Sequence, residues 1–84
     1  MLLGPGVRVL QEVTMREIEA VFAVTDQLGI SREALVIPLL PRTPGRVRRM
    51  PNGRIEIVAD ASDFPGFVER LEDALRAADL VPLP

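Results

Sequence analysis

The clearest pattern in this sequence is a run of apolar residues at helical spacing from Met15 to Leu28. Its apolar and small side chains fall on one broad face and its charged ones fall opposite, as in a helix that packs on a core. Thr14 and Glu17 have the spacing of a capping box, which marks the first turn of a helix. Gly29 follows this pattern at the position where a residue in the left-handed conformation commonly ends a helix. The sequence therefore predicts a helix over residues 15–28.

A second helical pattern runs from Phe64 to Asp79. Asp63 precedes it as an N-cap, and Pro65 falls in the first turn, where a missing backbone N–H costs nothing. The face opposite the apolar arc is rich in carboxylates, which we expect to be solvated rather than to hold a metal ion. The apolar arc itself consists of Phe64, Phe67, Val68, Leu71, Ala74, Leu75 and Ala78.

Asn52-Gly53 is a strong hairpin signal, because both residues tolerate the positive φ that a two-residue turn needs. After this turn, Ile55 and Ile57 alternate with polar residues, which is the period of a half-buried strand. An arginine-rich stretch comes before it. We therefore expect two antiparallel strands joined by a two-residue turn, with Ile55 and Ile57 facing the core.

Two further strands are predicted on weaker patterns. Residues 7–13 place Val7, Val9 and Val13 on one face, which favours a first strand. The run from Leu35 to Leu40 is almost continuously apolar, as in a strand that is covered on both faces. Pro38 lies inside this run and cannot donate to a neighbouring strand, so we place the run at an edge of the sheet.

The assembled order is strand, helix, strand, arginine-rich arm, strand, helix, or βαβ(β)βα. We expect one α+β domain over residues 1–84, because a chain of this length has room for a single core. Two helices that each have one apolar face pack well on one face of a sheet. The predicted architecture is therefore a two-layer sandwich, with a small, mostly antiparallel sheet and both helices on the same face.

The composition argues against an enzyme. The chain has no Cys, His, Lys, Tyr or Trp, so the usual nucleophiles, proton shuttles and imidazole or thiolate metal ligands are missing. We therefore expect no catalytic residues, no cofactor and no metal site. No segment has the length of a membrane span, and we find no signal peptide, so a cytoplasmic protein is the default expectation.

Positive charge is concentrated in one segment. The stretch from Arg42 to Arg54 contains five arginines and no acid, hence +5, whereas the remainder has five arginines and twelve acids, hence −7. Guanidinium groups bind phosphates well, so this segment is a candidate anion or nucleic-acid site. Against this, it has no aromatic residue to stack on bases, and its arginines could simply pair with acids of the same chain. The candidate residues are Arg42, Arg46, Arg48, Arg49 and Arg54.

If both helices cover one face of the sheet, an apolar strip is left on the other face or at the Pro38 edge. Such strips usually mark an interface unless another part of the chain, such as the residues before 10 or after 79, folds over them. We therefore predict a small non-enzymatic interaction or scaffold module that forms a two-fold homodimer through its sheet. Nucleic-acid or phosphate binding through the arginines is the alternative, and no membrane partner is expected. The residues predicted for self-association are Leu10, Leu35, Ile37, Pro38 and Val58.

Overall fold

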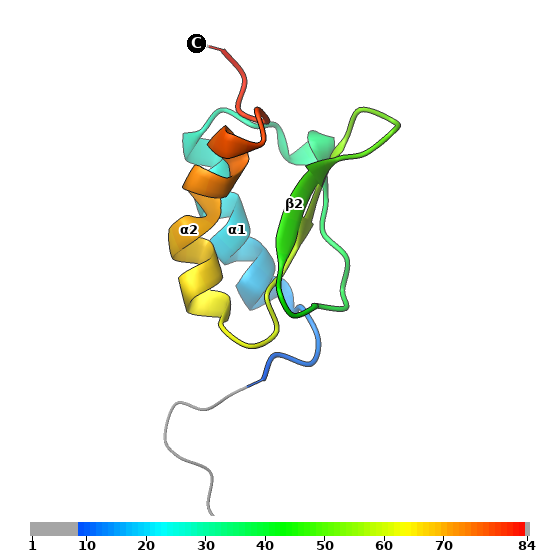
Figure 1. Ribbon diagram of the computed structural model, residues 1–84, viewed down its shortest axis with the longest axis vertical. Helices are drawn as coiled ribbons and strands as arrows, with labels where there is room; N and C mark the ends of the chain where they lie inside the picture. Colours follow the sequence, from blue (N-terminus) through cyan, green and yellow to red (C-terminus); the bar gives the residue numbers. More distant parts are fainter. Residues whose placement is uncertain (1–8, 84) are drawn as a thin grey trace, which may run out of the picture.

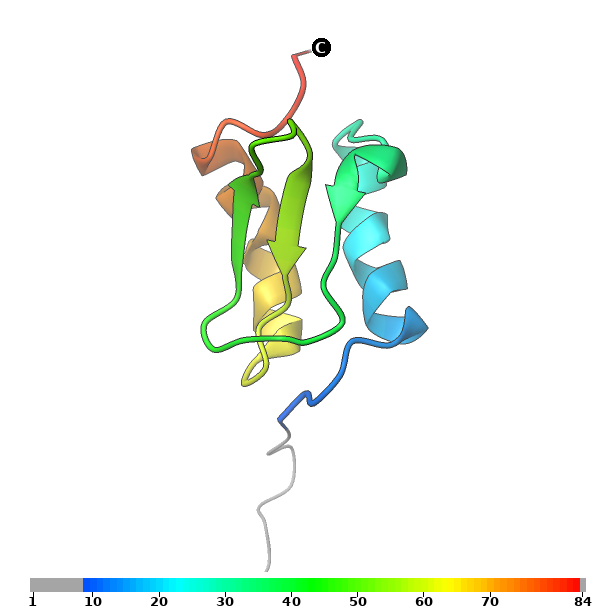
Figure 2. The ribbon, with the colours of Figure 1, turned by 90° about the vertical axis from the view of Figure 1, so that its right-hand side faces the viewer.

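A computed structural model describes residues 9–83 of the chain, with two helices beside a small sheet, an α+β fold (Figure 1). Both helices lie on the same side of the sheet in two perpendicular views (Figures 1 and 2). The elements in chain order are α1 (Met15–Gln27), the 3-10 turn η1 (Arg32–Ala34), β1 (Leu35–Val36), β2 (Arg46–Arg49), β3 (Ile55–Val58) and α2 (Phe64–Ala77).

The sheet has three strands in the order β1-β3-β2. β2 pairs antiparallel with β3 over four residue pairs, whereas β1 pairs parallel with it over two, so the sheet is mixed. Parallel neighbours cannot be joined by a tight turn. The chain therefore leaves β1, passes below the end of β3 and enters β2 on the far side, which Figure 2 shows as the long green connection.

Local signals explain both helices, and both predictions are confirmed. A capping box forms at the start of α1, where the Glu17 carboxylate accepts hydrogen bonds from the Thr14 N–H at 2.8 Å and from its hydroxyl. Gly29 ends the helix with a φ of 75°, which a residue without Cβ adopts at little cost. At α2, the Asp63 carboxylate accepts the Gly66 N–H at 3.0 Å.

The hairpin forms at the predicted place, but its turn differs from the prediction. The Met50 N–H donates to the Arg54 carbonyl at 2.7 Å, so the loop between these residues has three members, Pro51, Asn52 and Gly53. Only Gly53 has a positive φ, at 88°. Pro51 prefers the negative φ of the first turn position, which favours a three-residue loop closed by a left-handed glycine over a two-residue turn.

Of the two weaker strand predictions, the first is wrong and the second is confirmed in part. Residues 9–13 form no strand, and Val7 lies outside the described residues. Val13 is buried at 2% exposure but Val9 is 65% exposed, so the alternation did not reflect a common face. The apolar run beginning at Leu35 does lie at a sheet edge, but strand pairing stops at Val36, two residues before Pro38.

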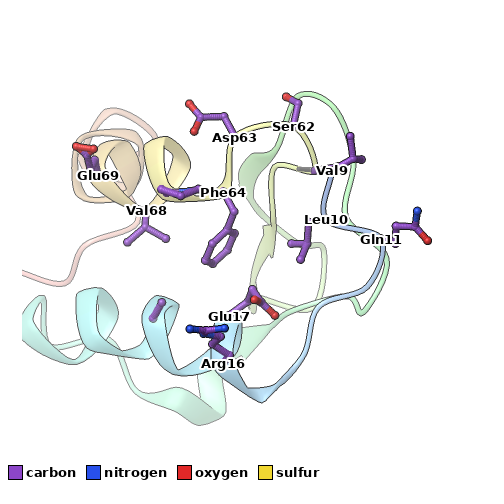
Figure 3. A pocket seen from close by; sticks show the side chains of 13 residues that line it. Val9, Leu10, Gln11, Arg16, Glu17, Ser62, Asp63, Phe64, Val68 and Glu69 are labelled. Atoms are coloured by element: carbon purple, nitrogen blue, oxygen red, sulfur yellow. The ribbon is translucent and has the colours of Figure 1, made fainter. Parts of the chain in front are cut away.

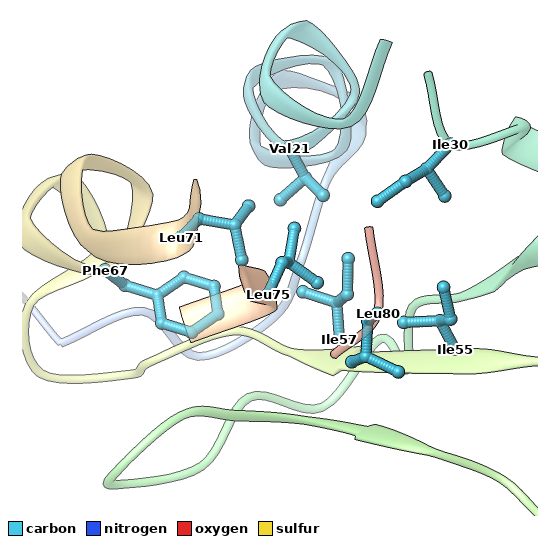
Figure 4. Close-up of a cluster of buried hydrophobic side chains, with 8 residues drawn as sticks. All are labelled: Val21, Ile30, Ile55, Ile57, Phe67, Leu71, Leu75 and Leu80. Carbon is cyan, nitrogen blue, oxygen red and sulfur yellow. The ribbon is translucent and has the colours of Figure 1, made fainter. Parts of the chain in front are cut away.

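The hydrophobic core fills the space between the helices and the inner face of the sheet (Figure 4). Ile55 and Ile57 of the central strand face it with 4% and 0% exposure, as predicted. Leu71 and Leu75 from α2 are fully buried against them. The buried cluster consists of Val21, Ile30, Ile55, Ile57, Phe67, Leu71, Leu75 and Leu80.

Candidate functional site

The outer face of β2 carries charge rather than apolar side chains. Since Val47 packs against the core and side chains alternate along a strand, Arg46 and Arg48 project to the outer face of β2. The Arg48 Nε lies 2.7 Å from the Glu56 carboxylate directly opposite on β3, and a terminal nitrogen of Arg46 lies 3.9 Å from the same oxygen. Two guanidinium groups thus share one carboxylate, which leaves a net positive charge.

The other three arginines of the candidate segment lie on either side of this pair. Arg42 and Arg46 both line a depression of about 420 Å³ before β2. Arg49 donates to the Gly53 carbonyl at 2.9 Å, which keeps it at the hairpin turn near Arg54. Within residues 9–83, Arg42, Arg49 and Arg54 have no carboxylate at salt-bridge distance. Pairing within the described chain therefore neutralises only a part of this positive segment.

A buried carboxylate anchors the base of the hairpin. Asp60 is 7% exposed and accepts hydrogen bonds from the N–H groups of Gly45 at 3.1 Å, Ser62 at 2.8 Å and Asp63 at 2.9 Å. The Ser62 hydroxyl donates to it at 2.8 Å. These donors, with the Gly45 N–H first, lower the pKa of Asp60 from 3.8 to about 2, against the effect of burial. Asp60 thereby ties the segment before β2 to the segment before α2, and no motif around it had indicated this role.

The residues predicted for self-association do not form one open strip. Leu35 and Ile37 are half-buried and pack against the core, and Val58 is only 3% exposed. Leu10 is half-buried beside Ala61, whose carbonyl accepts its N–H at 2.7 Å. These four residues offer little surface to a second chain, and only Pro38 lies beside a well-exposed apolar stretch.

That stretch was missed because the strand was expected to continue through it. The chain leaves β3 after Val36 and pairs again only at Arg42, which bridges to Asp60. Between the Val36–Glu56 pair and the Arg42–Asp60 bridge, one segment advances by six residues and the other by four. The longer segment therefore loops outward between these two contacts. Leu39 and Leu40 are 57% and 71% exposed as a result. We call Pro38, Leu39 and Leu40 the leucine surface.

A groove lies between the first turns of the two helices (Figure 3). Its volume is about 960 Å³, and Leu10, Phe64 and Val68 point into it. Two carboxylates at its rim already accept other hydrogen bonds, because Glu17 caps α1 and Asp63 caps α2. The groove has an apolar floor, and Arg16 and Glu69 are the other charged residues of its lining.

Residues 9–83 contain no group of three or more carboxylates placed to share a metal ion. Neither helix in this part of the chain is both long and apolar enough to span a bilayer. Comparisons with protein-family models, curated proteins and solved structures found no match to this chain. Its function must therefore be argued from its own surfaces.

Proposed function

We propose that this chain is a small non-enzymatic interaction module, a two-layer α+β sandwich that associates with a second copy of itself. Its composition supports the absence of catalysis, since a chain without His, Cys, Lys or Tyr lacks the usual acid–base and nucleophilic groups. The carboxylates Glu17, Asp60 and Asp63 support the same conclusion, because each already accepts backbone hydrogen bonds.

The observation that carries the proposal is the exposure of the leucine surface. Leu39 and Leu40 stand side by side with 57% and 71% of their surface in water. Burying a leucine side chain contributes about 1.5–3 kcal/mol, so a two-fold contact that covers both residues in both copies has a substantial driving force. A symmetric dimer is the commonest assembly that places one patch against itself.

The surroundings of the leucine surface can supply the remaining contact area. The Val13 N–H donates to the Leu39 carbonyl at 2.8 Å, which brings the segment before α1 alongside. Met15, two residues further on, is 63% exposed. A stable interface buries on the order of 1,200–2,000 Å² in total, so the leucines would form its centre and the segment around Met15 a part of its rim.

The test is the mass in solution of the wild-type protein and of a Leu39→Asp, Leu40→Asp double variant. By sedimentation equilibrium, the wild-type mass should rise with concentration towards twice the 9.2 kDa of the chain. The double variant should stay at the single-chain mass and keep its helical circular dichroism, because both side chains are exposed in the protomer.

Leu83→Asp is the matched control, because Leu83 is 92% exposed and lies beyond α2, apart from the leucine surface. This variant should associate like the wild type. A wild-type protein that remains a single chain at high concentration, or a double variant that still dimerises, contradicts the proposal.

A further inference from the structure

β2 has a neighbour on one side only. In the order β1-β3-β2 it is an edge strand, and no other strand of residues 9–83 pairs with its outer side. The Met50 N–H bonds to the Arg54 carbonyl, which makes this a hydrogen-bonded pair of the antiparallel ladder. Bonded and non-bonded pairs alternate along such a ladder. The backbone groups of Arg46 and Arg48 therefore point to β3, and those of Val47 and Arg49 point to the free edge.

The side chains beside this edge differ between the two faces of the strand. Arg46 and Arg48 project from the outer face, with 59% and 44% of their side chains exposed. Their shared partner Glu56 supplies a single negative charge. On the inner face, Val47 is half-buried and packs against the core. Arg49, opposite Ile55, lies on this inner face at the hairpin end. An incoming strand would thus meet Arg46 and Arg48 on the outer face and Val47, with Arg49 after it, on the inner face.

We propose that the free edge of β2 binds an extended acidic peptide, which adds to the sheet as a fourth strand. Its backbone would pair with the N–H and C=O groups of Val47 and Arg49, as in other cases of strand addition. Because side chains of a strand alternate between faces, acidic residues at every second position would lie beside Arg46 and Arg48. The residues between them would lie beside Val47.

Charge distinguishes this partner from the other candidates. A second copy of β2 would set arginine beside arginine, and like charges across strands are destabilising, so the edge resists self-pairing. The proposal is therefore independent of self-association through the leucine surface. A nucleic acid would use the arginines, but residues 42–54 include no aromatic side chain for stacking, and the free backbone groups would serve no purpose. An acidic peptide uses both features.

The first experiment measures binding by fluorescence anisotropy with labelled, capped peptides of about eight residues, a common strand length. In the test peptide Glu alternates with Val, and in the charge control Lys replaces Glu. A third peptide keeps every Glu but carries N-methyl groups on alternate amides, which blocks pairing without a change of charge. The test peptide should bind, and the other two should bind at least about tenfold more weakly.

Matched variants locate the site. An Arg46→Gln, Arg48→Gln double variant should weaken binding of the test peptide about tenfold, since each exposed ion pair contributes up to roughly a factor of five. Arg70→Gln is the control, because Arg70 is a similarly exposed arginine on α2, with 64% of its side chain in water. Binding by this variant should match the wild type.

The backbone contact has its own readout in the wild-type protein. By nuclear magnetic resonance, the test peptide should slow hydrogen exchange of the Val47 and Arg49 amides, which point to the free edge, more than that of the Arg48 amide. Arg49→Pro, which removes one of these donors at an edge position where proline is tolerated, should bind more weakly than Arg49→Ala. Unchanged exchange at Val47 and Arg49 overturns the proposal.

Two binding results would also overturn it. Equal affinity for the test peptide and the N-methylated peptide would show that charge alone is recognised. A single-stranded oligonucleotide that binds more tightly than the test peptide at the same salt concentration would assign the arginines to nucleic acid instead.

Discussion

Replacing Asp60 by Asn tests whether a single carboxylate holds the base of the hairpin in place. The Asp60 carboxylate accepts backbone hydrogen bonds from Gly45 on one side and from Ser62 and Asp63 on the other. An Asn side chain keeps one acceptor oxygen but presents an NH₂ group in place of the other. At least one buried N–H then meets a donor rather than an acceptor, and the negative charge is lost.

The pKa of Asp60 sets the size of the expected effect. The carboxyl titrates at about 2 in the folded protein against 3.8 for the ordinary group. At about 1.36 kcal/mol per pKa unit, ionised Asp60 stabilises the fold by about 2 kcal/mol. Because the folded pKa is the lower one, this contribution is complete above the unfolded pKa and is lost as the pH falls from about 4 to about 2.

The assay is urea unfolding of the wild type and Asp60→Asn between pH 7 and pH 2.5. At pH 7 the variant should be less stable by about 2 kcal/mol, which lowers Tm by roughly 8–16 °C in a domain of this size. At pH 2.5 the difference should be smaller by about 1.5 kcal/mol, because this pH lies below the unfolded pKa of 3.8 and close to the folded pKa of about 2, so the carboxyl of the unfolded chain is mostly protonated and folding must remove that proton. Asp73→Asn, an exposed carboxylate on α2, should behave like the wild type.

A difference between wild type and Asp60→Asn that is the same at both pH values would refute the reasoning. The cost would then come from the shape of the side chain and not from the ionised carboxylate.

Two further substitutions test the packing. Gly45→Ala should destabilise the fold by roughly 1–3 kcal/mol in urea unfolding, because its Cβ would lie 2.6 Å from the Val58 carbonyl oxygen. Gly53→Ala, which meets no atom within 4 Å but has a φ of 88°, should cost only about 1 kcal/mol, and an equal loss would contradict the steric argument. Leu75→Ala should cost about 2–5 kcal/mol, as Leu75 is 0% exposed, whereas the exposed Leu83→Ala should stay within about 0.5 kcal/mol.

The arginine segment shows which features of a candidate site can be predicted from the sequence. The excess of positive charge over residues 42–54 was visible without coordinates, because charge is a property of composition. Which arginines share Glu56, and which backbone groups face outward, depend on the register of β2 against β3. A shift of one residue would exchange the two faces of the strand, so no inspection of the segment alone could assign them.

The leucine surface shows the same limit for apolar residues. The run from Leu35 to Leu40 correctly indicated an edge strand, but it predicted that the apolar residues would be covered. Pro38 was the available signal that pairing would stop, since proline also restricts the residue before it. The chain pairs again only where Arg42 bridges to Asp60, in the segment after β3. The position of this bridge decides how far the chain loops outward.

By itself, the sequence determined the two helices, their ends and the site of the hairpin. The signals at Thr14, Gly29, Asp63 and Gly53 act within a few residues, so they operate before distant segments meet. Only the tertiary structure decided that β1 runs parallel to β3, that residues 9–13 form no strand, and that Asp60 gathers its donors. These features need contacts between residues far apart in the chain, and a local pattern of polar and apolar positions does not contain them.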